Sequence, residues 1–124
     1  MPSAPRIAEA EWKVMKVLWN DPEPKPAYDI IQALSGTEVW QPKTVKTLLG
    51  RLVKKKVLGY RTYKNLYLYY PLLSEAECVA AESASFLERC FGGSLQPMLA
   101  HFVEHHGLSP AQIKELKAIL DRGK

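Results

Sequence analysis

The sequence is poor in the residue that would cross-link it. Its 124 residues include two cysteines, Cys78 and Cys90, which is too few for a disulfide framework. Both are predicted to lie on one helix, where their spacing in sequence corresponds to about 18 Å along the axis, too far for a disulfide within the chain. We therefore expect two reduced thiols that pack as small apolar groups.

Long apolar runs are also missing. The longest uncharged stretch, residues 90–103, contains two glycines, a proline and a histidine and is shorter than the roughly 20 apolar residues that cross a bilayer. The first residues lack the basic segment followed by an apolar run that a secretory signal needs. These absences predict a cytoplasmic protein with no membrane-spanning segment.

The motifs of common enzyme classes are absent as well. The sequence contains no glycine-rich phosphate loop, no nucleophile elbow and no paired-cysteine motif. A hydrolase or redox enzyme needs a nucleophile, a base and an orienting group in some recognisable arrangement. We therefore predict that the protein is not an enzyme, and no cofactor is expected.

A histidine cluster near the C-terminus is the one candidate for metal binding. His101 and His105 share a helical face, with His106 and Glu104 beside them. A transition-metal site needs three or four converging ligands, and the last would have to come from Cys90 or from a partner chain. Surface histidines are the favoured interpretation, and no metal site is predicted.

Acidic residues are missing from one long segment. The whole chain has 13 acidic residues, yet none lies between Glu38 and Glu75. Residues 1–73 hold 12 basic and 6 acidic side chains, and the remainder hold 5 and 7. The front part therefore suits a polyanionic partner such as nucleic acid, and the back part has another role. The basic residues of the segment are Lys43, Lys46, Arg51, Lys54, Lys55, Lys56, Arg61 and Lys64.

The hydrophobic pattern of the front part changes period along the chain. Helical spacing predicts helices over residues 9–19 and 27–34, and a third helix opened by Pro42. Residues 58–72 are rich in tyrosine and other strand-forming residues and predict a hairpin that turns at Lys64 and Asn65. Three helices followed by a hairpin indicate a winged helix-turn-helix.

The third helix is amphipathic. Its apolar positions share one side and consist of Val45, Leu48, Leu49 and Leu52. At 100° per residue the opposite side is basic and polar. It carries Lys43, Lys46, Thr47, Gly50, Arg51 and Lys54.

A helix of this kind fits the major groove of B-DNA, where its N-terminal residues reach base edges and later basic residues reach phosphates. The predicted base contacts are Lys43, Thr44, Lys46 and Thr47. The predicted phosphate contacts are Arg51, Lys54 and Lys55 on the helix and Arg61 and Lys64 on the hairpin. A charge run can also be only a solvated face. The alternative function is therefore a winged-helix adaptor that binds an acidic protein without specific DNA binding.

The back part is predicted to be helical. A capping box at residues 74–77 begins a helix that continues to about Phe91, and a second helix follows Ser94 to form a helical hairpin. Another capping box at residues 109–112 begins a third helix. The predicted domains are therefore a winged-helix DNA-binding domain at 1–73 and a helical dimerisation domain at 74–124.

A domain of about 50 residues without a disulfide or a metal is too small for a stable core of its own. Pairing of the same helices in a homodimer would bury their apolar faces. The predicted dimerisation residues are Phe86, Leu87, Cys90, Leu95, Met98, Leu99, Phe102, Ile113, Leu116 and Leu120.

Several sequence strings support a family assignment. They are Trp40-Gln-Pro-Lys-Thr-Val-Lys-Thr-Leu-Leu, Leu58-Gly-Tyr, Tyr69-Tyr-Pro-Leu, Ala10-Glu-Trp-Lys-Val-Met-Lys-Val-Leu-Trp, Ser85-Phe-Leu, Gly93-Ser-Leu and Leu99-Ala-His-Phe. In these strings the chain resembles the penicillinase-repressor family, the BlaI and MecI proteins with their CopY relatives. The resemblance covers nearly the whole chain.

The resemblance implies a bacterial transcriptional repressor of resistance or stress genes. Such a repressor would be a homodimer that binds double-stranded operators with TACA and TGTA half-sites. In the β-lactam systems of the family, a membrane sensor peptidase signals release and the repressor is cut in its dimerisation helices. The corresponding bond here would join His101 and Phe102. The copper-sensing branch uses cysteine pairs that this chain lacks after Cys90.

The chain departs from the family pattern at three places. His101 stands where an asparagine often precedes the phenylalanine. The hairpin tip, Lys64-Asn65-Leu66, stands where many members have a glycine and an arginine. Ala8 replaces the usual serine cap of the first helix, and loss of such a cap costs about 1 kcal/mol.

Overall fold

The computed structural model describes residues 5–123, and its elements follow the predicted order. The helices are α1 (Glu9–Asn20), α2 (Ala27–Ser35), α3 (Pro42–Lys54), α4 (Glu75–Phe91), α5 (Leu95–His106) and α6 (Pro110–Arg122). The strands β1 (Leu58–Tyr63) and β2 (Leu66–Pro71) lie between α3 and α4. The predicted fold class, mainly helical with one small hairpin, is confirmed.

The chain divides into two compact units, the first ending at Glu82 and the second beginning at Ser83. This division falls inside α4, further along than the predicted domain boundary at 73/74. The first turns of α4 belong to the first unit because Cys78 is buried there. The indole Nε1 of Trp19 also donates to the carbonyl of Leu73 at 3.0 Å.

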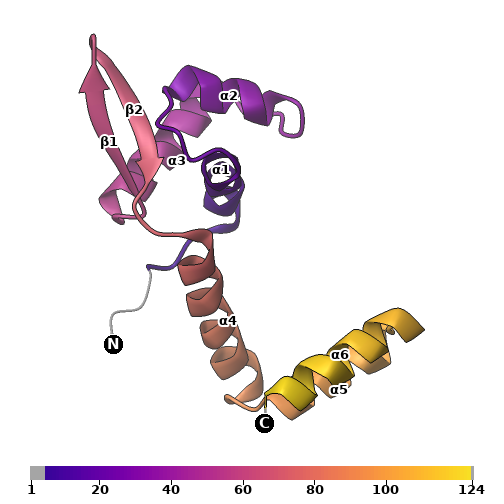
Figure 1. Cartoon of the computed structure of the whole chain (residues 1–124). Helices are drawn as coiled ribbons and strands as arrows, with labels where there is room; N and C mark the ends of the chain where they lie inside the picture. Colours follow the sequence, from indigo (N-terminus) through magenta and orange to yellow (C-terminus); the bar gives the residue numbers. More distant parts are fainter. Residues whose placement is uncertain (1–4, 124) are drawn as a thin grey trace. The chain divides into compact units, whose positions relative to one another are not determined.

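The first unit is built around three helices and the hairpin. Each pair among α1, α2 and α3 is in contact, and the hairpin packs against them through β1 and β2 (Figure 1). Burial of this many aliphatic side chains is the main stabilising contribution to the unit. The buried apolar residues are Ile7, Val14, Met15, Leu18, Ile30, Leu34, Val45, Leu48, Leu49, Leu52, Val57, Leu58 and Cys78.

The hairpin is antiparallel, and Tyr60 pairs with Tyr69 in its register. Its two turn residues, Lys64 and Asn65, have φ values of 49° and 68°. Positive φ at both central residues is the signature of a type I′ turn, whose twist matches that of the flanking strands. The turn predicted at these residues is therefore confirmed. Lys25 forms an isolated bridge with Tyr69 and extends the sheet on that side.

The second unit contains the end of α4 together with α5 and α6. The capping box predicted to begin α6 is present, since Ser109 Oγ accepts from the Gln112 N–H at 3.1 Å and Gln112 Oε1 accepts from the Ser109 N–H at 2.9 Å. From Ser83 to Gly123 no described residue is buried. The helices of this unit do not pack closely along one another in the part of the chain that the structure describes. The helical hairpin of α4 and α5 stays a prediction, and the rings of Phe91 in α4 and His101 in α5 lie with their centroids 6.1 Å apart.

Among the described residues, no helix combines the length and the apolar character that a membrane span requires.

Candidate nucleic-acid interface

The local sequence of α3 explains where this helix begins and ends. Pro42 occupies the first helical turn, where its fixed φ suits a helix start and its missing N–H is not needed. The helix ends in a Schellman arrangement in which the Val57 N–H donates to the Leu52 carbonyl at 3.0 Å. The left-handed position, usually a glycine, is Lys56 with φ of 65°. This non-glycine residue is strained there.

The amphipathic prediction for α3 is confirmed. Its four predicted apolar positions are all buried. The four predicted base-contacting residues are all exposed, and they are Lys43, Thr44, Lys46 and Thr47. The hydroxyl of Thr47 donates to the Lys43 carbonyl at 3.0 Å, so in the free chain its proton is used within the helix.

Four of the predicted phosphate-contacting residues are exposed. Arg51 and Lys54 lie on the outer side of α3, and Arg61 and Lys64 lie on the hairpin. Tyr60 and Arg61 are successive residues of β1, so the side chain of Arg61 projects from the face of the sheet opposite to Tyr60. The ammonium of Lys64 lies 5.3 Å from the centre of the Tyr63 ring, which gives the tip of the wing a cation–π contact.

Lys55 differs from the other predicted phosphate contacts. Its Nζ lies 2.5 Å from Oε1 of Glu11 and donates to the Arg6 carbonyl at 2.9 Å. Glu11 is 1% exposed and is the only buried charged side chain among residues 5–123. Its Oε1 also accepts from the backbone N–H of Ala8 at 2.7 Å. The Lys55 ammonium is therefore bonded within the protein instead of being free on the surface.

Sequence reasoning missed the role of Glu11. The signal was available, because a glutamate three residues after a helix N-cap position is the second half of a capping box. Ala8 occupies that N-cap position and has no side-chain acceptor. Only the hydrogen bond from the Ala8 N–H to the Glu11 carboxylate can therefore form. The same carboxylate oxygen also accepts from Lys55.

Tyrosines cover one face of the hairpin. The rings of Tyr60 and Tyr67 are stacked with their centroids 4.4 Å apart, and Tyr69 lies beside both of them. Burial raises the pKa of the Tyr69 hydroxyl, and the neighbouring Tyr67 and Tyr60 raise it further. The hydroxyl therefore stays a neutral donor at physiological pH. Ring stacking across the strands stabilises the hairpin that carries Lys64.

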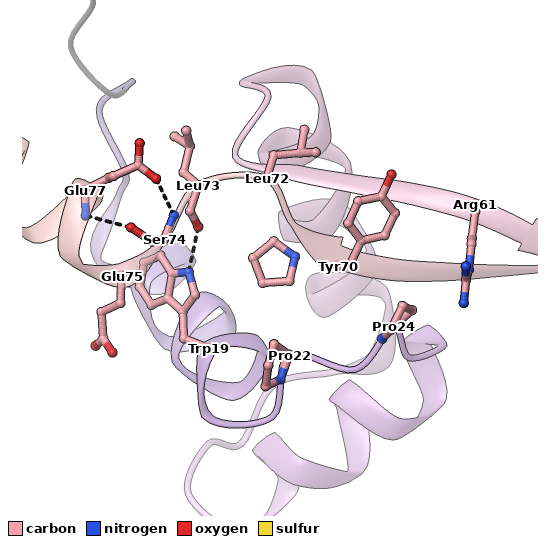
Figure 2. A pocket seen from close by; sticks show the side chains of 11 residues that line it. Trp19, Pro22, Pro24, Arg61, Tyr70, Leu72, Leu73, Ser74, Glu75 and Glu77 are labelled. Carbon is pink, nitrogen blue, oxygen red and sulfur yellow. Dashed lines mark hydrogen bonds between the residues drawn. The ribbon is translucent and has the colours of Figure 1, made fainter.

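An open hollow of about 750 Å³ lies between the hairpin, the end of α1 and the start of α4. Trp19, Pro22 and Tyr70 line its apolar part. Figure 2 shows Arg61 at one end of the hollow and Glu77 at the other. Glu77 is engaged there in a capping box with Ser74, so the predicted box at residues 74–77 is confirmed.

The ten predicted dimerisation residues remain accessible in the single chain. Half-buried positions are Phe86, Leu87, Met98, Leu99 and Leu116, and exposed positions are Cys90, Leu95, Phe102, Ile113 and Leu120. Val103 and Ile119, which sequence reasoning did not select, are also exposed apolar residues of α5 and α6. Val103 lies four residues after Leu99, and Ile119 lies three residues after Leu116, so the helical spacing of these residues was the available signal.

The histidines of α5 do not form a ligand set with their acidic neighbours. The rings of His101 and His105 are stacked with centroids 4.2 Å apart, and His105 Nδ1 lies 2.9 Å from the His101 carbonyl oxygen. Within the described part of the chain no three His, Cys, Asp or Glu side chains come together as metal ligands. The bond between His101 and Phe102 lies inside α5, and both residues are exposed.

Comparison with known proteins identifies the family to which this chain is similar. The family model described as "Penicillinase repressor" matches residues 7–122. The penicillinase repressor of Bacillus licheniformis is 37% identical over 124 residues, covering 100% of this chain and 96% of that protein. The methicillin resistance regulatory protein MecI of Staphylococcus aureus (strain N315) is 32% identical over 116 residues, with 94% of each chain covered.

Two solved structures are similar to part of this chain. The DNA-binding domain of the repressor BlaI is similar with a TM-score of 0.55 and 36% identity, covering 62% of this chain and 93% of that one. The monomeric form of Bacillus licheniformis BlaI in complex with the blaP half-operator gives a TM-score of 0.53 and 36% identity over the same shares. The chain belongs to the penicillinase repressor family of DNA-binding transcriptional repressors.

Proposed function

We propose that the chain represses transcription as a homodimer, in which each protomer places α3 in the major groove of a palindromic operator and holds the flanking phosphates with its wing. The exposed face of α3 is the observation that carries this proposal. It presents Lys43, Thr44, Lys46 and Thr47 toward a partner, while the opposite face is buried in the core. Amines and hydroxyls at the N-terminal end of a helix are suited to base edges.

The phosphate contacts are assigned to exposed basic side chains that are not held in an ion pair in the part of the chain that the structure describes. Arg51 and Lys54 follow the base-contacting residues along α3, and Arg61 and Lys64 extend the cationic surface onto the hairpin. Neutralised phosphates release counterions, so binding through these groups must weaken as salt rises. Lys55 is left out of this assignment because Glu11 already holds its ammonium.

The homodimer is supported by the exposure of the apolar side chains of the second unit. None of its described residues is buried, and the short helices α5 and α6 would be marginal in water without tertiary packing. A second copy can cover their apolar side chains through an isologous contact. A dimer would place two copies of α3 on one face of the duplex, with half-site centres about 10 base pairs apart or a multiple of that distance.

Release from the operator is proposed to follow cleavage of the bond between His101 and Phe102, with a membrane sensor peptidase as the signalling partner. Cleavage would separate α5 into two pieces and remove part of the proposed dimer contact. Because the bond lies within a helix, α5 must open locally before a protease can bind it in an extended form.

Selection of duplexes from a random pool tests the DNA-binding part of the proposal. The expected result is an enriched palindrome bound several orders of magnitude more tightly than a scrambled duplex of the same composition. Sedimentation of the same preparation should show a dimer. Equal affinity for selected and scrambled duplexes would contradict operator binding and favour the alternative, an adaptor that binds an acidic protein.

A further inference from the structure

The centre of the cationic face of α3 has no side chain. Successive residues of an α-helix are about 100° apart around the axis, so the directions of Lys43, Lys46 and Lys54 all fall within about 40° of the direction of Gly50. The three lysines and Gly50 are exposed. Gly50 therefore lies in the middle of the basic surface, with long cationic side chains on both sides of it.

In the part of the chain that the structure describes, no neighbouring atom requires a glycine at position 50. A Cβ placed on Gly50 would have no heavy atom within 4 Å outside its own helical backbone. Gly50 is also not among the glycines with positive φ, which are Gly92, Gly93 and Gly107. Glycine is, after proline, the least favourable residue for a helix interior. An alanine would therefore fit the free chain and stabilise α3.

We propose that Gly50 is a specificity-determining position at which the DNA duplex makes its closest approach to the backbone of α3. This inference rests on the proposed function. The flanking lysines have flexible stems and can spread around a groove wall, whereas a Cβ at the centre of the face is fixed to the helix. With no Cβ at Gly50, the helix can lie deeper in the groove. The amines and hydroxyls before it can then reach base edges, and the Coulomb attraction to phosphates becomes stronger at shorter distance.

The test uses two glycine-to-alanine variants of the full chain. In Gly50→Ala a methyl group is placed at the centre of the basic face. Gly36→Ala is the matched control, because a Cβ there also meets no atom within 4 Å and Gly36 has helical angles, φ −77° and ψ −20°. Both proteins are titrated with the duplex that the wild-type chain selects from a random pool, and their thermal unfolding is recorded.

We expect Gly50→Ala to unfold at a higher temperature than the wild type and yet to bind the selected duplex about tenfold more weakly. The Gly36→Ala protein should bind within about twofold of the wild type. Wild-type affinity in Gly50→Ala, or an equal loss in both variants, would overturn the inference. If the wild-type chain enriches no duplex, the proposed function fails and this inference fails with it. If the wild-type chain enriches a duplex that Gly50→Ala binds equally well, only this inference fails, so the two failures are distinguishable.

A larger substitution separates close approach from a simple change in helix stability. Glutamine is a good helix former with a longer side chain that can donate to phosphate. If the duplex closely approaches this point of α3, Gly50→Gln should bind more weakly than Gly50→Ala. Tighter binding by the glutamine variant would show that the complex leaves room for a side chain, and the inference would be wrong.

Discussion

Lys55 and Glu11 join the end of α3 to the start of α1, with Lys55 Nζ 2.5 Å from Glu11 Oε1. The same carboxylate caps α1 by accepting from the Ala8 N–H, and Lys55 also donates to the Arg6 carbonyl. The buried Glu11 carboxylate therefore holds both the segment before α1 and Lys55, the residue that follows α3. Removal of the carboxylate disturbs both places at once.

Glu11→Ala is expected to lower the free energy of unfolding by about 2–3 kcal/mol. The substitution leaves the Ala8 N–H without an acceptor. It also leaves the Lys55 ammonium, whose side chain is 32% exposed, without its counter-charge. The cost lies below that of a fully buried pair because water reaches Lys55. Urea unfolding measures the change.

Glu9→Ala is the control for that measurement, since Glu9 is an exposed acidic residue of the same helical turn. Its loss should cost only the few tenths of a kcal/mol of an acid near a helix N-terminus. Glu11→Gln keeps an acceptor for the Ala8 N–H and should fall between the two. Equal losses in Glu9→Ala and Glu11→Ala would show that the buried ion pair contributes nothing to stability.

The salt dependence of DNA binding should separate Lys54 from its neighbour Lys55. Lys54 is exposed on α3, so Lys54→Ala should reduce the slope of log affinity against log salt by about one unit for the lost phosphate contact. Lys55→Ala should leave the slope unchanged while destabilising the fold, because it leaves the Glu11 carboxylate buried and unpaired. A slope change of the same size in both variants would show that Lys55 leaves Glu11 when DNA binds.

Most of the first unit could be predicted from local chemistry. The apolar spacing of α3, Pro42 at its start and the Lys64-Asn65 turn depend on near neighbours in the sequence, and all of them appear in the structure as expected. The capping boxes at Ser74 and Ser109 are equally local. These features were accessible because each rests on residues only a few positions apart.

Contacts between distant residues could not be predicted in the same way. From the sequence, Lys55 is predicted to be one more phosphate contact of the basic segment. Nothing near Lys55 in the sequence indicates that Glu11 lies against it in the fold. The end of α3 carries Lys56 in a left-handed conformation, where sequence rules expect glycine. Tertiary packing of Val57 and Leu58 into the core outweighs that local preference.

Stability should depend on pH through Glu77. Its pKa is held below the ordinary value of 4.5 because its carboxylate accepts from the Ser74 N–H and the Ser74 hydroxyl interacts with it. A carboxylate with a lowered folded-state pKa contributes stability above its unfolded pKa, and the contribution is lost as pH falls through the folded value. Glu77→Ala should therefore be less stable than the wild type at pH 7, and the difference should shrink below pH 4.5.

Thermal unfolding across this pH range provides the check, with Glu23→Ala as control. Glu23 is exposed in the loop before α2, and its side chain takes part in no capping box. Its variant should follow the wild type at every pH. The unfolding temperatures of wild type and Glu77→Ala could instead differ by the same amount from neutral to acidic pH. That result would mean that the charge of Glu77 does not contribute to stability.

Leu120→Glu should convert the proposed dimer into a monomer. Leu120 is an exposed apolar residue of α6, and burial of a new carboxylate in a dimer contact would be strongly unfavourable. Lys117→Glu is the control, because Lys117 is an exposed charged residue of the same helix and its change should leave the dimer intact. Sedimentation at equal concentration distinguishes the two outcomes.

Loss of the partner should also appear in the helical content, since α5 and α6 bury no residue in one chain and short isolated helices are marginal in water. The far-ultraviolet circular dichroism of Leu120→Glu should therefore decrease, while the first unit keeps its own core and still unfolds cooperatively. Affinity for a full palindrome should fall much more than affinity for a single half-site, because only the dimer binds both half-sites together. If Leu120→Glu remains a dimer with unchanged helicity, this part of α6 lies outside the contact between protomers.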